Sequence, residues 1–255
     1  DEMQKKHAFA HQIRIGAAGG ISTPASALAA FMMGAAYVVT GSVNQACIEA
    51  GTSEHVRKLL QKVASTDVMM SPASDMFEMG VELQVLKPGT LFGPRAKKLY
   101  DYYKQYNSID DIPVAERQKL EQQVFKQPLE EIWQATIEFF EKRDPEQIER
   151  AKDNPHRKKA LIFRWYLGLS SNWANAGTTG RELDFQIWCG PSMGAFNDWV
   201  KGTYLEDYQN RRVADVAEQI MQGAAYLFRV QNLKMQGVGF PLEMERFLPK
   251  KQISQ

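Results

Sequence analysis

Two apolar segments that end in glycine, one helix length apart, decide the fold of this chain. They read Ile13-Arg14-Ile15-Gly16-Ala17-Ala18-Gly19-Gly20 and Ala36-Tyr37-Val38-Val39-Thr40-Gly41-Ser42. Between them, Ser22-Thr23-Pro24 predicts a helix N-terminus and Gly34 a helix end. Strands joined by short connections through a helix are typical of a parallel sheet covered by helices. The start of the chain is therefore predicted to form βα units, with its first strand over residues 13–17.

The composition is that of an ordinary globular protein without a strong electrostatic preference. Of its 255 residues, 44% are hydrophobic and 24% charged, and the net charge is +1. This balance does not favour a polyanion, and the basic run at 156–159 is typical of a solvated helix end, so we expect no nucleic-acid partner. Only two cysteines are present, without a signal peptide or a membrane-length apolar run. We expect a cytoplasmic protein outside the membrane.

Beyond about Thr66 the sequence predicts a covering loop followed by helices. The Met-rich stretch 69–79 and the prolines and glycines after it indicate an ordered loop with one strand at 81–86. Apolar periodicity predicts helices at 95–106, 114–126, 128–142, 160–167 and 213–230. Asp144 and Gln147 predict a capping box for one more helix. No repeat or flexible linker interrupts the chain, so we expect the C-terminal part to pack against the βα part. The change in composition near residue 66 sets the predicted domains at 1–66 and 67–255.

The two glycine-bearing bends predict an anion site. A phosphate needs several N–H groups that converge on a small volume, and a strand that ends in small residues before a helix provides them. Gly19 and Gly20 allow the backbone to approach the oxygens. Gly41 and Ser42 would form the second half of the site, with the Ser42 hydroxyl as an additional donor. The alternative is that Gly19-Gly20 only makes a tight turn.

The other candidate residues each have a structural alternative. Asn44 and Gln45 follow the second bend and would either reach a ligand or cap a helix. Cys47 would line a site or be an inert buried thiol. Asp75 and Glu78 have the spacing of an acid/base pair, but the favoured alternative is that they are solvated or paired with Arg95 or Lys87. The weak pair His7/His11 lacks further ligands, so no metal site is predicted.

Several motifs along the chain carry a resemblance to a known family. They are Gly16-Ala17-Ala18-Gly19-Gly20-Ile21, the stretch 34–42, Glu49-Ala50-Gly51-Thr52-Ser53, Asp75-Met76-Phe77-Glu78, Gln84-Val85-Leu86, Phe163-Arg164-Trp165-Tyr166 and the stretch 189–197. Together they resemble the trans-acting enoyl reductases of polyunsaturated fatty acid and polyketide synthases, a branch of the nitronate monooxygenase-type flavoenzymes. The likeness runs from about residue 7 to about residue 228. Its first motif is common to many flavin barrels, whereas the later ones are narrower.

The resemblance implies a fold, a cofactor and partners. The fold class would be α/β, with the last βα units of a TIM (β/α)₈ barrel over 1–66 and a mostly helical domain after them. FMN would be held by its phosphate at Gly19, Gly20, Gly41 and Ser42, and NADPH would supply electrons. The substrate would be an enoyl thioester on an acyl carrier protein. No catalytic residue is identified, because the strands that carry the flavin ring contacts and the proton donor are expected upstream.

Two further expectations concern the assembly and the alternatives. A complete barrel needs about eight βα units in roughly 250 residues, and two are recognised here. We therefore expect a missing N-terminal barrel half, in the same protein or a second chain, to pair with the open strand edge, and homo-oligomers are compatible with the sequence.

The alternative function is a non-catalytic helical module that docks an acyl carrier protein or synthase partner. A third possibility is a barrel enzyme that acts on a sugar phosphate or a nucleotide. It is weaker, because the motifs beyond residue 70 would have no role in it.

Overall fold

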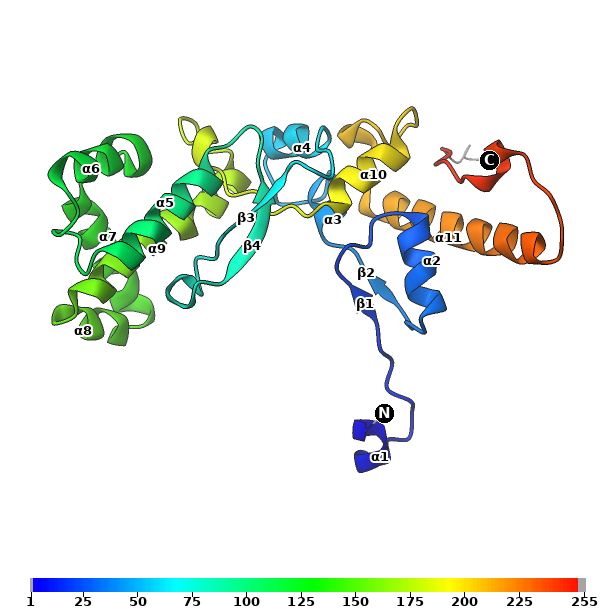
Figure 1. The fold of residues 1–255 in the computed structure, drawn as a ribbon, viewed down its shortest axis with the longest axis horizontal. Helices are drawn as coiled ribbons and strands as arrows, with labels where there is room; N and C mark the ends of the chain where they lie inside the picture. Colours follow the sequence, from blue (N-terminus) through cyan, green and yellow to red (C-terminus); the bar gives the residue numbers. More distant parts are fainter. Residues whose placement is uncertain (1, 252–255) are drawn as a thin grey trace. The chain divides into compact units, whose positions relative to one another are not determined.

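The parallel pairing expected at the start of the chain is present in the computed structural model, which describes residues 2–251. After α1 (Glu2–His7), β1 (Ala17–Ala18) pairs in parallel with β2 (Val38–Val39), and Ala17 lies opposite Val38. The helix α2 (Pro24–Met32) connects the two strands (Figure 1). The predicted strand over 13–17 is wrong in extent, since only its last residue belongs to β1. β2 is equally short, and a strand forms only where a neighbour supplies hydrogen bonds.

The ends of α2 follow the sequence prediction. Thr23 is the N-cap, and its side-chain oxygen accepts a hydrogen bond from the Ser26 backbone N–H at 3.3 Å. The Ser26 hydroxyl oxygen accepts in return from the Thr23 N–H at 3.0 Å, which completes a capping box. Gly34, with φ +97°, follows the helix in the left-handed region, as predicted.

Residues 190–251 pack with the βα part, although we predicted them in the helical domain. One compact unit contains residues 2–51, 57–66 and 190–251. It holds α3 (Ser42–Gln45), most of α4 (Glu54–Leu60), α10 (Ser192–Val200), η4 (Tyr208–Asn210), α11 (Val213–Met235) and η5 (Leu242–Glu245). α11 packs against α2. Gly223 allows this approach, because a Cβ there would lie 2.4 Å from the Pro24 side chain. The domain boundaries at 1–66 and 67–255 therefore differ from the compact units.

The second unit, residues 52–56 and 67–189, begins with a hairpin. β3 (Val68–Pro72) pairs antiparallel with β4 (Glu82–Leu86), and η1 (Phe77–Met79) lies between them. β4 is the predicted strand, whereas β3 falls in the stretch predicted as a covering loop. The sequence of β3 does not alternate and ends in proline, which argues against a strand. Its pairing with β4 outweighs that preference.

Helices complete the second unit and match the predicted ones. They are α5 (Phe92–Gln105), α6 (Val114–Lys119) with the π-helix η2 (Leu120–Phe125), α7 (Leu129–Arg143), α8 (Glu146–Lys152), α9 (Pro155–Ala176) and η3 (Glu182–Asp184). Their core is aromatic, with Phe77, Phe92, Phe125, Phe163 and Tyr166 fully buried. The predicted capping box before α8 is wrong: Gln147 Nε2 donates to the Asp144 carboxylate at 2.7 Å, so the two side chains bond each other.

Candidate anion-binding site

Each of the two glycine bends follows one of two neighbouring parallel strands, and both bends lie at the same edge of the sheet. Gly19 and Gly20 follow β1 directly and adopt φ values of +86° and +72°. Gly41 follows β2 and is the N-cap of α3, which begins at Ser42. Because Ala18 lies opposite Val39 in the parallel register, both bends start at the same level of the sheet. The structure thus brings together the four residues predicted to hold an anion.

The space directly around these glycines is open among residues 2–251. A Cβ built on Gly19, Gly20 or Gly41 would meet no atom within 4 Å. At Gly16, inside the first motif, a Cβ would instead lie 2.2 Å from the half-exposed Tyr37 ring, which would have to move to admit it. The exposed bends leave room for a phosphate, and their glycines permit close approach of the backbone. A four-residue helix such as α3 adds little dipole field of its own.

The Ser42 side chain connects the second bend to a distant segment. Its Oγ accepts a hydrogen bond from the Gly190 backbone N–H at 3.1 Å. This bond uses an acceptor lone pair and leaves the hydroxyl hydrogen free to donate, as an anion would require. From the sequence, residues 190–197 form either a bend between helices, which is favoured, or a wall of an acyl tunnel. The bend is wrong, since residues 192–197 of this segment lie in α10. The contact of this segment with Ser42 was missed, because no local pattern indicates a bond across so many residues.

The N-terminus of α2 contributes fewer donors than the sequence suggested. The backbone N–H groups of Ser22 and Thr23 both donate to Ser26 Oγ, at 3.1 Å and 3.0 Å. The Ser26 N–H is bonded to Thr23 within the capping box. Three amides at this helix end are therefore satisfied by their own neighbours. The donors for an anion are those of the bends and of α3.

Residues next to the second bend have mainly structural contacts. Asn44 Nδ2 donates to the Thr40 carbonyl at 3.1 Å, and its Oδ1 accepts from the Thr40 hydroxyl at 2.9 Å. The Cys47 thiol is buried and bonds the Val43 carbonyl. Burial, with a smaller contribution from Glu49, raises the pKa of the Cys47 thiol to about 11. This thiol is the inert alternative, since it stays protonated at neutral pH.

Asp75 and Glu78 do not form an acid/base pair, in agreement with the alternative favoured from the sequence. Glu78 forms ion pairs with Arg157 and Arg164, each at 3.4 Å, in place of the partners expected from the sequence. One Asp75 oxygen accepts the Met76 N–H at 3.1 Å. Within residues 2–251, no cluster of three or more potential metal ligands occurs, and no helix has the length and apolarity needed to cross a membrane.

A buried ionic cluster in the second unit was missed by the sequence analysis. The fully buried Asp184 carboxylate pairs with Arg95, with Arg181 at 3.2 Å and with Lys126 at 3.5 Å. It also accepts the Tyr166 hydroxyl at 2.9 Å. Burial, together with the charge of Asp184, raises the pKa of Tyr166. Each of the three cations pairs with this one carboxylate, so we assign the cluster a role in stability.

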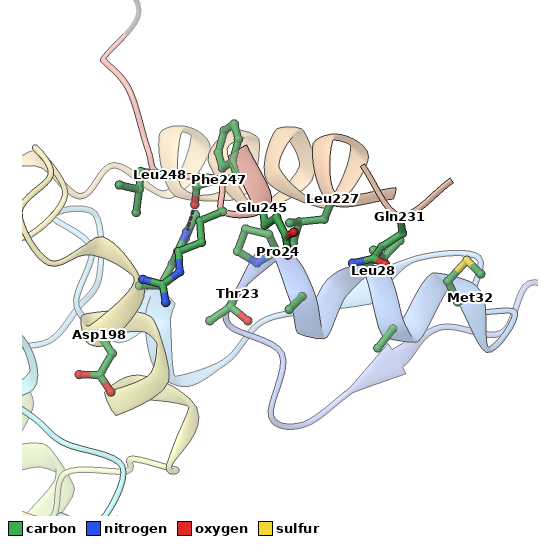
Figure 2. Close-up of a pocket in the computed structure, with 14 residues that line it drawn as sticks. Thr23, Pro24, Leu28, Met32, Asp198, Leu227, Gln231, Glu245, Phe247 and Leu248 are labelled. Atoms are coloured by element: carbon green, nitrogen blue, oxygen red, sulfur yellow. Dashed lines mark hydrogen bonds between the residues drawn. The ribbon is translucent and has the colours of Figure 1, made fainter. Parts of the chain in front are cut away.

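The first unit also contains a groove of about 740 Å³ between α2, α11 and residues 245–248. Figure 2 shows Leu28 and Met32 of α2 along one side and Leu227 and Gln231 of α11 along the other. None of Gly19, Gly20, Gly41 and Ser42 lines this groove. The candidate anion site is therefore separate from it.

Comparison with known proteins identifies the class to which this architecture belongs. Residues 106–185 match the family described as "[Acyl-carrier-protein] S-malonyltransferase, inserted helical domain". Among solved structures, the enoyl reductase domain of MlnA from the macrolactin cluster of Bacillus amyloliquefaciens is 42% identical, with a TM-score of 0.86. The match covers 92% of this chain and 53% of that one. The chain is thus homologous to part of an enoyl reductase domain, and the fold class of TIM-barrel βα units with a mostly helical domain is confirmed.

Two relatives have names that refer to polyunsaturated fatty acid synthesis and to polyketide biosynthesis. The chain is 49% identical over 228 residues to a subunit of the polyunsaturated fatty acid synthase of Thraustochytrium sp., covering 88% of this chain and 15% of the relative. It is 45% identical over 235 residues to polyketide biosynthesis protein PksE of Bacillus subtilis, covering 91% of this chain and 30% of the relative. The resemblance inferred from the motifs is confirmed, and the chain spans less than a third of these two relatives.

Proposed function

We propose that this chain is the phosphate-holding part of an FMN-dependent enoyl reductase that acts on enoyl thioesters of acyl carrier protein. The reaction would serve polyunsaturated fatty acid or polyketide synthesis. The pair of open glycine bends at the carboxyl ends of two adjacent parallel strands carries the proposal, since this is where barrel enzymes bind phosphate groups. The similarity to the MlnA enoyl reductase domain supports the reaction class.

The residues present fit a flavin phosphate. The backbone at Gly19 and Gly20 would hold one side of the phosphate, and Gly41 with the Ser42 hydroxyl the other, without a Cβ in the way. When bound, FMN would supply hydride transfer to the enoyl group after reduction by NADPH. The Gly190 N–H would keep the Ser42 side chain oriented by its bond to Oγ. No residue of this chain is assigned to protonation of the substrate.

The proposal includes a partner for the sheet. Among residues 2–251, β1 pairs with β2 alone, so its other edge is open to another strand. The missing N-terminal barrel half would supply that strand. We further propose that the assembled enzyme works in the cytoplasm.

The experiment expresses the chain together with the remaining barrel units and measures flavin absorbance and NADPH-dependent reduction of an enoyl thioester. We expect a yellow protein whose FMN affinity falls about tenfold or more in Gly41→Val, because the side chain would enter the space for the phosphate. Gly239→Val is the matched control, since a Cβ there also meets no atom within 4 Å. A colourless, folded assembly would refute the cofactor assignment.

The non-catalytic module remains the second candidate, favoured by the match of residues 106–185 to a helical domain of an acyl-carrier-protein transferase. Under this function the chain alone would bind acyl carrier protein without flavin. Surface plasmon resonance with immobilised carrier protein tests this directly. Tight binding by the chain alone, together with an assembly that never binds FMN, would favour the module over the reductase.

A further inference from the structure

A groove between α7 and α9 in the second unit has no role in the proposed reductase. Its volume is about 400 Å³, within the usual range of small-molecule sites of about 300–1,000 Å³. Six of its lining residues are apolar: Ala135, Phe139, Phe140, Leu161, Trp165 and Leu169. Phe139 is 53% exposed, and covering it with an apolar ligand would be favourable.

The depth of the groove depends on a glycine of α9. A Cβ on Gly168 would lie 3.4 Å from the Ser74 Oγ, so any larger side chain would narrow the groove. Thr136, which also lines it, already donates its hydroxyl hydrogen to the Ile132 carbonyl at 2.7 Å. Thr136 therefore needs no hydrogen bond from a ligand, and the apolar residues of the lining suit a hydrocarbon chain.

Two arginines give the groove a positive rim. Arg164 pairs with Glu78 at 3.4 Å, but Glu78 pairs equally with Arg157, so one carboxylate is shared by two guanidinium groups. The Arg143 guanidinium lies 5.6 Å from the centroid of the Phe139 ring. Within the described part of the chain, Arg143 has no carboxylate within ion-pair distance. The guanidinium groups of Arg143 and Arg164 line the groove, and the Glu78 carboxylate is shared between Arg164 and Arg157, so the rim stays positive and suits a phosphate group.

We propose that this groove binds a linear acyl or alkyl chain that carries a phosphate group. The hydrocarbon chain would lie along Ala135 and Trp165, and the phosphate would pair with Arg143 and Arg164, which present planar donors suited to phosphate oxygens. This site is independent of the glycine bends and requires no flavin.

The test titrates the full chain with dodecyl phosphate and follows tryptophan fluorescence and calorimetric heat. We expect saturable binding at one site. Ala135→Phe should abolish it, because the exposed Ala135 can be enlarged without disturbing the core and its new ring would fill the groove. Gln134→Phe, at the adjacent exposed position outside the groove lining, should bind as the wild type does.

A second pair of variants tests the charged rim. Arg143→Gln should weaken dodecyl phosphate binding about tenfold, as expected for the loss of a charge-assisted hydrogen bond, and leave dodecanol binding unchanged. Lys142→Gln, the neighbouring exposed cation outside the groove lining, should change neither. Absence of saturable binding, or wild-type affinity in folded Ala135→Phe, would overturn the site. Equal affinity for dodecanoate and dodecyl phosphate would overturn the phosphate preference. Flavin absorbance of the assembled enzyme should be unaffected in all four variants, so this test fails independently of the reductase proposal.

Discussion

Replacing Asp184 by asparagine tests whether the buried ionic cluster stabilises the second unit. The change keeps the size of the side chain but removes the negative charge that faces Arg95, Arg181 and Lys126. Asp184 is fully buried, and the side chains of Arg95 and Arg181 are only 16% and 11% exposed, so water cannot replace the lost carboxylate well. Breaking such a buried pair costs about 3–5 kcal/mol.

Urea unfolding followed by tryptophan fluorescence measures this loss. Trp173 is a suitable probe, because the Arg181 guanidinium lies 4.2 Å from its ring centroid. With a slope of about 2 kcal/mol per M, the midpoint should fall by about 1.5–2.5 M. The control is Asp101→Asn, which removes a largely exposed pair at 4.0 Å and should cost less than about 1 kcal/mol. If Asp184→Asn lost no more stability than this control, the assigned role of the cluster would be wrong.

Two further changes test packing and pH dependence. Gly194→Ala should destabilise the first unit by about 1–3 kcal/mol in thermal unfolding, because the new Cβ would lie 2.0 Å from the Ser65 backbone nitrogen. The control, Gly239→Ala, should be nearly neutral, since a Cβ there meets no atom within 4 Å. Equal melting temperatures of the two variants would contradict the close packing at Gly194. Hydrogen bonding from Lys119, then from Tyr102 and Lys98, lowers the pKa of Glu116 from 4.5 to about 2. This stabilisation should be complete above pH 4.5 and lost as the pH falls through 2. Acid unfolding of Glu116→Gln should lack that loss, and an unchanged acid profile would show that Glu116 does not contribute.

Short-range features could be predicted from the sequence. Thr23 and Pro24 predicted the start of α2, and Gly34 its end, because capping and left-handed backbone depend on a few adjacent residues. The amphipathic helices were predicted for the same reason, since a helix repeats its pattern every 3.6 residues. The four residues of the candidate anion site were also selected from the sequence, and β1 and β2 bring them to one edge. Their binding of FMN stays a prediction.

Long-range contacts were decided by the tertiary structure alone. β3 exists because β4 supplies its hydrogen bonds, against the preference of its own residues. The Gly190 bond to Ser42, the packing of α11 on α2 and the charges around Asp184 join residues distant in sequence. Sequence by itself determined where the long amphipathic helices form and where the backbone can turn, because those preferences are local. The tertiary structure alone decided which surfaces of these elements pack together, because the side chains that become buried between two elements must match in shape and charge.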